Sequence, residues 1–134
     1  MQTFLPYESF HQSLTVLDKK RLGKQRVEAY QILRAIHDSS YGWQSHPAVR
    51  MWRNYPSALI EYYNASLDVF EAHGGHNIKL SPMDVNKSAI IYPPWLGNAQ
   101  FHASHRSNLL RKDYNHYSKY GWTEALDLPY VWPL

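Results

Sequence analysis

The residues best suited to chemistry fall on one predicted helix in the first third of the chain. Arg21, Gln25 and Glu28 follow one another at spacings of four and three, and Ile32 comes four residues later. On a helix these side chains form one row beside the apolar face, where charged groups lose solvation unless they are paired. The row therefore indicates a partly buried carboxylate kept for a ligand. The alternative is an Arg21–Glu28 ion pair that only tethers helices.

Further cations crowd the same helix. Lys19, Lys20 and Arg21 stand in its first turn, where positive charge opposes the helix macrodipole by up to ~1 kcal/mol. Lys24 follows, and Arg26 projects toward the interior side of the helix. Because the first-turn charges do not favour the helix, we expect this group of side chains to bind an anionic ligand.

A second basic group lies on a predicted helix near the C-terminus. His102 and Arg106 are four residues apart, and His105, Arg111 and Lys112 complete a basic edge. The two histidines could bind a metal at their spacing of three, but the sequence offers no evident third ligand. We therefore expect these five residues to contact nucleic acid, with no metal at the site.

Trp95 follows Pro93 and Pro94 and could form a rigid wall or wedge against a nucleic acid, although ordinary packing is an equal alternative. The sequence has no glycine-rich phosphate loop, no zinc-protease helix motif and no nucleophile elbow. Its acids do not cluster as a two-metal nuclease requires. An enzyme with this sequence is expected to work without a cofactor.

Positive charge is concentrated in two stretches. The net charge is +3, but residues 19–34 carry six basic and one acidic side chain, residues 102–112 carry three basic ones, and the remainder of the chain is acidic. Such a distribution attracts polyanions more strongly than an even spread. Aromatic residues make up 15% of the chain and suit stacking on unpaired bases. Two solvated helix faces are the alternative to a nucleic-acid surface.

The elements that must position these residues are helices separated by proline and glycine. Apolar positions of the long second helix share one face, with Ile32 at its edge. Asp18 and Asn98 are plausible N-caps, and Pro47 and Pro56 can each start a helix. The expected helices span residues 8–17, 18–37, a short stretch from 47, 56 to the Gly74–Gly75 stop, and 98–112.

The remaining segments are predicted to be irregular. Residues 74–97 contain three prolines and read as an ordered loop with at most one helical turn near Met83. Residues 89–92 are the only strand candidate. Residues 114–134 form an aromatic tail in which Pro129 and Pro133 prevent a long helix. The fold class is therefore mainly α, with residues 1–134 forming one compact domain.

Length and composition narrow the class of protein. A chain of 134 residues is the usual size of one domain. It has no apolar run long enough to span a membrane and no visible secretion signal. It also has no cysteine, which suits a reducing cytoplasm. We expect a cytoplasmic protein that binds DNA, with no membrane partner and no obligate protein partner.

Four segments, residues 1–6, 17–28, 93–95 and 104–112, resemble the pyrimidine-dimer DNA glycosylase family, the group of phage T4 endonuclease V. The resemblance spans most of the chain and is closest to short bacterial and phage members. It implies a single helical domain that flips a nucleotide out of damaged duplex DNA. In that family an N-terminal α-amine attacks the sugar C1′ and forms an imine, and β-elimination then cuts the strand.

Carried over by position, the assisting carboxylate is Glu28, with Arg21 and Arg26 beside it. Gln2 is too large for efficient removal of the initiator methionine, so Met1 supplies the amine. An α-amine titrates at about 7.7–8.0, which leaves a useful fraction as the free nucleophile at neutral pH. Two other functions stay open. One is a non-catalytic DNA- or RNA-binding protein, and the other is an enzyme acting on free modified nucleotides in a closed pocket lined by Glu28 and the two histidines.

Overall fold

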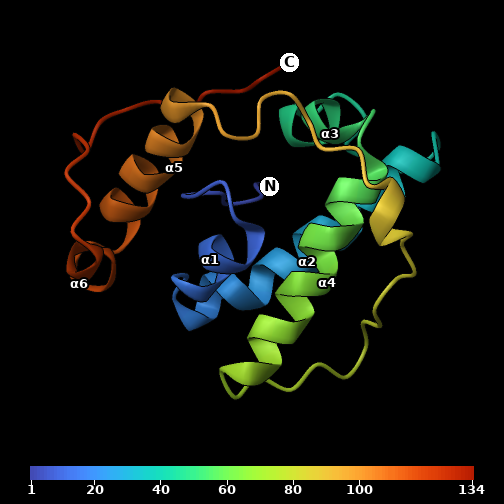
Figure 1. The fold of residues 1–134 in the computed structure, drawn as a ribbon, viewed down its shortest axis with the longest axis horizontal. Coiled ribbons are helices and arrows are strands. Elements are labelled where there is room, and N and C mark those ends of the chain that lie inside the picture. Colours follow the sequence, from blue (N-terminus) through green and yellow to red (C-terminus); the bar gives the residue numbers. More distant parts are fainter.

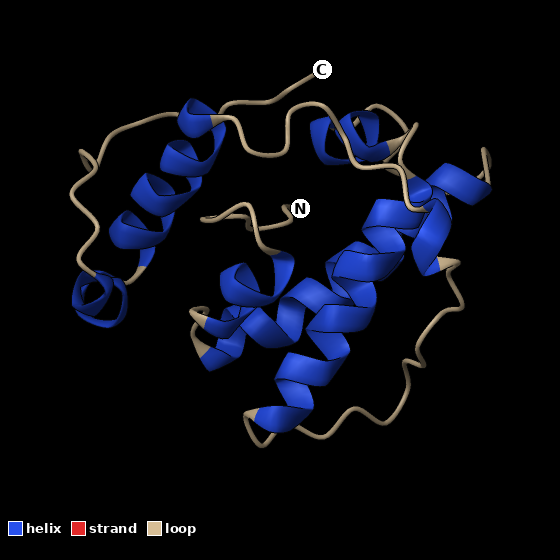
Figure 2. Ribbon diagram, viewed as in Figure 1, coloured by secondary structure: helices blue, strands red, loops and turns tan.

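The computed structural model describes residues 1–134 and contains helices and loops but no strand (Figure 2). This confirms the mainly α fold class. None of the helices combines the length and the apolar character that crossing a lipid bilayer requires. The helices are α1 (Phe10–Thr15), α2 (Lys19–His37), α3 (Pro47–Trp52), α4 (Pro56–Ala72), α5 (Ala99–Lys112) and α6 (Tyr114–Tyr117), with short 3-10 helices at Lys87–Ala89 and Ser118–Tyr120.

The helix starts follow the capping residues read from the sequence. The Asp18 side chain accepts the Arg21 backbone N–H at the start of α2, and Asn98 caps α5 in the same way. Pro47 and Pro56 occupy the first turns of α3 and α4, where a missing N–H leaves no bond unmade. These four expected starts are confirmed.

Three local predictions are wrong. The first helix is shorter than residues 8–17, because Ser9 caps it and the chain leaves the helix after Thr15. The turn in the long loop forms at Lys87–Ala89, not near Met83. Residues 89–92 form no strand, since no neighbouring strand exists and the Ile91 N–H donates to the side chain of Ser57.

The core forms where α2 crosses α4, with α1 packed on α4 and α3 on α2 (Figure 1). The expected apolar face of α2 is buried, except that Ile36 is only half-buried. Ile32 is completely buried and not at the edge of that face. Much of the aromatic content serves the core, in which the largest fully buried side chains are Trp52, Tyr62, Tyr63, Tyr117 and Phe101.

The N-terminal segment, residues 1–6, runs through the middle of the molecule as an extended chain. It passes between α5 on one side and the α2–α4 pair on the other (Figure 1). Residues 2–6 are all buried. A buried extended segment without a strand partner must find other partners for its backbone N–H and C=O groups. In this protein those partners are side chains from the surrounding helices.

Candidate active site

Gln25 of α2 is the first of these side chains. Its Oε1 accepts the Phe4 backbone N–H at 2.8 Å and the Tyr62 hydroxyl at 2.7 Å. Its Nε2 donates to the Gln2 carbonyl at 3.1 Å and to Glu28 Oε2 at 3.2 Å. All four hydrogen-bonding positions of the amide are used, which fixes its orientation. The same side chain therefore anchors the N-terminal segment and orients the Glu28 carboxylate.

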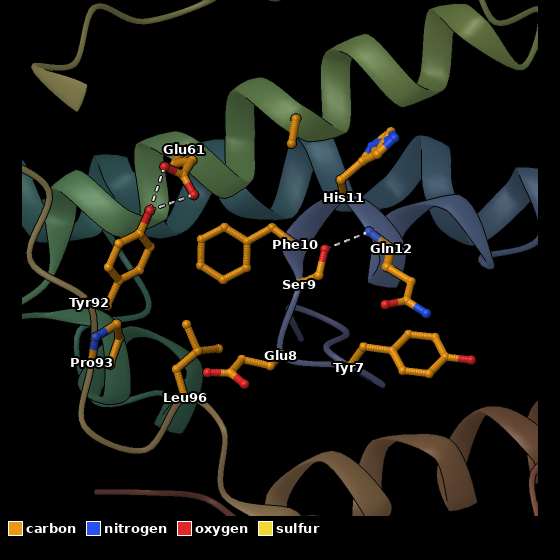
Figure 3. Close-up of a pocket in the computed structure, with 11 residues that line it drawn as sticks. Tyr7, Glu8, Ser9, Phe10, His11, Gln12, Glu61, Tyr92, Pro93 and Leu96 are labelled. Carbon is orange, nitrogen blue, oxygen red and sulfur yellow. Dashed lines mark hydrogen bonds between the residues drawn. The ribbon is translucent and has the colours of Figure 1, made fainter. Parts of the chain in front are cut away.

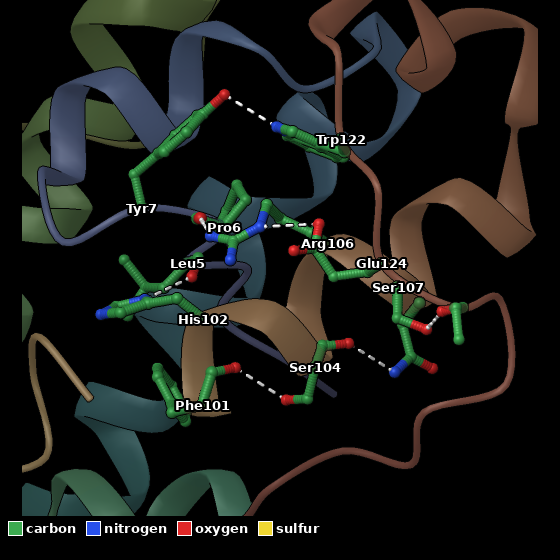
Figure 4. A network of polar contacts seen from close by, with 12 residues as sticks. Leu5, Pro6, Tyr7, Phe101, His102, Ser104, Arg106, Ser107, Trp122 and Glu124 are labelled. Atoms are coloured by element: carbon green, nitrogen blue, oxygen red, sulfur yellow. Dashed lines mark hydrogen bonds and ion pairs between the residues drawn. The ribbon is translucent and has the colours of Figure 1, made fainter. Parts of the chain in front are cut away.

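Two histidines of α5 hold the next part of the segment, and Figure 4 shows the first of them, His102, beside Leu5. His102 Nδ1 lies 2.7 Å from the Leu5 carbonyl oxygen, and the Gly97 N–H donates to its Nε2 at 2.9 Å. His102 Nδ1 therefore carries the proton. The Leu5 N–H donates to His105 Nδ1 at 2.9 Å. Burial lowers the pKa of His102, and it lowers the pKa of His105 to about 3, so both rings are neutral at pH 7.

Arg106 also binds the backbone of the N-terminal segment. Its Nη1 donates to the Pro6 carbonyl at 2.6 Å, and its Nε pairs with Glu124 at 3.0 Å (Figure 4). Tyr7, the next residue along the chain, accepts the Trp122 indole N–H at 2.9 Å. Helix α5 and the C-terminal tail therefore grip the segment together.

This placement does not fit direct DNA contacts by three of the residues predicted to make them. His102 and His105 are 5% and 0% exposed and bind the backbone of Leu5, and His105 Nε2 has no hydrogen-bond partner. Trp95 is also buried, and its indole N–H donates to the Met51 carbonyl at 3.3 Å. Ordinary packing, the alternative considered for Trp95, is what the structure contains.

Met1 and Glu28 line one cavity of about 310 Å³ beside Gln25. Lys20, Lys24 and Lys112 are exposed on its lining, so the cavity is bordered by positive charge that faces solvent. Glu28 is its only acidic residue. The complete lining is Met1, Gln2, Phe4, Lys20, Arg21, Lys24, Gln25, Glu28, Lys112 and Tyr130. The cavity therefore brings together the first residue of the chain, one carboxylate and a cationic border.

The Arg21–Glu28 ion pair does not form. Arg21 Nη1 pairs with Asp18 at 3.2 Å, and the only other ion pair joins Arg106 to Glu124. Burial alone would raise the pKa of Asp18, but hydrogen bonds from Tyr117 and Arg21 outweigh it and lower that pKa. Neither Glu28 nor the Met1 α-amine has an ionic partner in the protein. Both groups remain available to a ligand.

Sequence reasoning missed two residues of this region. Tyr130 comes from the C-terminal tail, and burial raises its pKa to about 12, so its hydroxyl stays protonated. His46 caps α3 by accepting the Ala48 N–H at 3.0 Å, and its pKa is lowered by burial and by the positive charge of the Met1 α-amine. The His-Pro pair suggests a helix start, but no sequence signal places it near Met1.

Other predicted cations lie outside the cavity. Arg26 donates to Asn77 at 2.8 Å and lies 4.2 Å from the centre of the Phe70 ring. Arg111 is exposed and donates to a carbonyl of the C-terminal tail. Lys19 is exposed on the first turn of α2. Of the eleven predicted nucleic-acid contacts, the structure brings Lys20, Arg21, Lys24 and Lys112 to the cavity.

A larger hollow of about 900 Å³ lies beside α1 and contains neither Met1 nor Glu28 (Figure 3). Glu8 and Glu61 line it, and the Tyr92 hydroxyl lies 2.8 Å from Glu61 Oε2. No lysine or arginine lines this hollow. Two carboxylates without a cation repel phosphate, so the smaller cavity is the better candidate for nucleic acid.

Comparison with curated proteins and with solved structures finds no match. A family model described as pyrimidine dimer DNA glycosylase matches residues 1–83. The matched region contains Met1, Gln25 and Glu28 together with helices α1 to α4, whereas α5 lies beyond it. Because the match covers more than half of the 134 residues, the chain belongs to the pyrimidine dimer DNA glycosylase family.

Proposed function

We propose that this protein is a DNA glycosylase with an associated abasic-site lyase activity on damaged pyrimidines. Met1 supplies the nucleophilic amine, and Glu28 orients or protonates the sugar. Phosphates of the damaged duplex lie against Lys20, Arg21, Lys24 and Lys112, and Lys19 and Arg111, which are exposed outside the cavity, bind further phosphates. Residues 1–134 act as one domain, since α5 reaches the rest of the core through the N-terminal segment.

One observation carries the proposal. Side chains from α2, α4 and α5 hold the N-terminal segment, and they lead Met1 into the same cavity as the unpaired Glu28 carboxylate. Packing of Phe4 and Leu5 in the core accounts for the burial of the segment, but it does not require Met1 and Glu28 to share a cavity. Positioning of a nucleophile next to its assisting acid is worth several orders of magnitude in rate.

The chemistry follows from these two groups. The free amine attacks C1′ with its lone pair while the C1′–N1 bond breaks, and the electron pair leaves with the base, which takes a proton. The amine nitrogen then loses a proton, the sugar ring opens as O4′ is protonated, and an imine joins Met1 to C1′. The C2′ proton is then lost to solvent, its electron pair forms a C2′–C3′ double bond, and the 3′ phosphate leaves with the electrons of the C3′–O bond, which cuts the strand.

The separation of the two groups suits this role. The Met1 amine forms no ion pair with Glu28, although the residues Met1 and Glu28 both line the cavity. A salt bridge between them would keep the amine protonated and block its lone pair. A sugar lying between amine and carboxylate would meet the nucleophile on one side and the proton donor on the other.

The test is borohydride trapping of the imine. Untagged protein is incubated with ultraviolet-damaged and abasic duplexes in the presence of borohydride, and the adduct is sequenced. The expected result is attachment at Met1. Adding residues before Met1 should abolish trapping and leave non-covalent DNA binding intact.

Other results would change the assignment. Attachment at Lys20 or Lys24 would keep the lyase and move its nucleophile. If neither duplex is trapped or cut while a known glycosylase succeeds, the repair function is wrong. A non-catalytic DNA-binding protein would then be the better description.

A further inference from the structure

Trp43 lies in an unusual position on the surface. Its side chain is 53% exposed, and its backbone φ is +71°, the only positive value at a residue other than glycine. A bulky residue in the left-handed region is strained and persists only where its surroundings fix it. The indole is nonetheless not used to fill the core. The indole is therefore accessible to a molecule outside the protein.

The loop that carries Trp43 is held firmly from within. The Gln44 side-chain amide lies 2.8 Å from the Ala35 carbonyl and 3.0 Å from that of Asp38. The guanidinium of Arg53 donates to the Gln44 carbonyl at 2.6 Å and to its Oε1 at 3.2 Å. The residue following Trp43 is therefore fixed on both sides. An indole presented in this way loses little further freedom when it binds.

A line of rings leads from Trp43 to the candidate active site. The ring centres of Trp43 and His46 are 5.7 Å apart, those of His46 and Trp132 are 6.0 Å apart, and those of Trp132 and Tyr130 are 5.6 Å apart. Tyr130 lines the cavity that contains Glu28. The exposed indole is therefore the outer end of an aromatic row that begins at the cavity.

Positive charge accompanies this surface. The guanidinium of Arg53 lies against Gln44, and that of Arg34 lies 4.7 Å from the centre of the Tyr41 ring in the same loop. Asp38 is the acid of this loop, and it accepts hydrogen bonds from Ser40. A flat aromatic face in a loop that also binds two guanidinium groups favours a partner that is planar and anionic, as a nucleotide is.

We propose that Trp43 stacks on the face of an unstacked base of the DNA whose damaged nucleotide occupies the cavity. The inference rests on the proposed function, because it takes the cavity as the place of the lesion. Flipping a nucleotide leaves a gap in the duplex, and an aromatic side chain offers a neighbouring unpaired base a new stacking partner. Trp43 is thus a residue for recognition of unpaired bases and takes no part in the bond-breaking steps.

The test compares Trp43→Asn with the unaltered protein on two duplexes. One contains a tetrahydrofuran residue, an abasic analogue that cannot form an imine, opposite 2-aminopurine, and the other is fully paired. Asparagine tolerates the left-handed backbone, so the melting temperature should be equal or higher. Affinity for the tetrahydrofuran duplex should fall by about 5- to 150-fold, the usual range for one stacked base, with little change for the paired duplex.

Two variants serve as controls. Trp43→Phe keeps an aromatic face and should retain most of the affinity. Tyr114→Asn removes another aromatic side chain, 58% exposed on α6, and should change neither affinity. Quenching of 2-aminopurine by the unaltered protein and its loss in Trp43→Asn would directly report stacking.

Equal affinities of Trp43→Asn and the unaltered protein for the tetrahydrofuran duplex would overturn the inference. So would a dimer that dissociates when Trp43 is replaced, since the indole would then contact a second copy. Imine trapping decides the proposed function separately. Trapping by the unaltered protein with normal binding by Trp43→Asn refutes only the role of Trp43. Indole-dependent binding without any trapping refutes only the lyase.

Discussion

Glu28 is the only carboxylate in the cavity that contains Met1, and its side chain accepts one hydrogen bond, from the amide of Gln25. Glu28→Gln keeps the shape and can still accept that hydrogen bond, but it cannot exchange a proton. We expect the strand-cutting rate to fall by about 10²- to 10⁴-fold while affinity for the tetrahydrofuran duplex persists. The measurement is single-turnover cleavage of an abasic duplex.

A matched control comes from the larger hollow. Glu61→Gln removes a carboxylate there and should leave the cleavage rate within about twofold of the unaltered value, as surface changes away from a site do. If Glu28→Gln instead unfolds the protein while its folded fraction cleaves at the full rate, Glu28 has a structural role only.

Burial of His105 is expected to make the free energy of unfolding depend on pH. Its pKa is about 3 in the folded protein because of burial, against 6.5 in the unfolded chain. The unfolded state therefore binds a proton first, and the free energy of unfolding falls as pH drops below 6.5. Between pH 7 and pH 5 this group alone should remove about 2 kcal/mol. Urea unfolding at the two pH values measures the loss.

Comparison with His105→Gln isolates the contribution of His105. Glutamine can accept the Leu5 N–H in place of His105 Nδ1 but does not titrate, so the variant should lose less stability on acidification. His102 and His46, whose pKa values are also lowered, account for what remains. An identical loss in both proteins would mean that His105 is accessible to protons in the folded state.

At the scale of single residues, sequence reasoning succeeded where the contact is local. The row of Arg21, Gln25 and Glu28 depends only on the helical repeat, and Gln25 does contact Glu28. It failed where the partner is distant in sequence. His105 binds the backbone of Leu5 across 100 positions. Nothing in the spacing of residues along α5 indicates that His105 is buried and accepts a backbone N–H group.

At the scale of elements, the segment that brings Met1 to the cavity, residues 1–6, is not a helix. The N-terminal segment has no strand partner, and Gln25 supplies contacts that a sheet would otherwise provide. Gln25→Leu would leave the Phe4 N–H and the Gln2 carbonyl unpaired, at about 1–3 kcal/mol for each buried group. We expect the segment to loosen locally before the whole protein unfolds.

Hydrogen exchange at the Phe4 amide measures this loosening. A loss of 1.4 kcal/mol or more should speed its exchange by about tenfold or more. Gln31→Leu makes the same change on the half-buried side of α2 and should leave that amide protected. Unchanged exchange in Gln25→Leu would show that α5 alone secures the segment.

The helices themselves were predictable because capping and proline signals act within a few residues, as Asp18 and Pro56 illustrate. The extended N-terminal segment was not, since nothing in residues 1–6 identifies its partners on α2 and α5. The 3-10 turn at Lys87–Ala89 was misplaced for a related reason. In that loop the Met83 N–H is taken by Asn64 of α4, a partner 19 positions away.

At the scale of the whole molecule, the two hollows differ in the sign of the charged side chains that line them. The smaller cavity has four cationic residues and one carboxylate, and the larger hollow has two carboxylates and neither lysine nor arginine. The sequence indicated two basic stretches, and the fold joins parts of both: Lys20, Arg21 and Lys24 come from α2, and Lys112 from α5. The side chains of Arg106 and Arg26 are taken up by Glu124 and Asn77.

This division predicts which cations govern the salt dependence of DNA binding. Each phosphate neutralised by a cation releases counterions and adds about 0.9 to the slope of log K against log salt. Lys20→Gln, Lys24→Gln and Lys112→Gln should each reduce the steepness of the slope by about 0.9, the value for one phosphate contact. Arg106→Gln should hardly change it, because that guanidinium binds Glu124 and the Pro6 carbonyl, and its loss should lower stability instead.

The slopes are measured by fluorescence anisotropy on the tetrahydrofuran duplex between 50 and 200 mM salt, a range over which several phosphate contacts change affinity by about 10³-fold or more. Lys87→Gln is the matched control, because Lys87 is exposed in a 3-10 helix that does not line the cavity. Its slope should equal that of the unaltered protein. Equal flattening by Lys87→Gln and Lys112→Gln would mean that DNA binds through general surface charge. A slope reduced by Arg106→Gln at unchanged stability would mean that the ion pair with Glu124 opens when DNA binds and that Arg106 then contacts a phosphate directly.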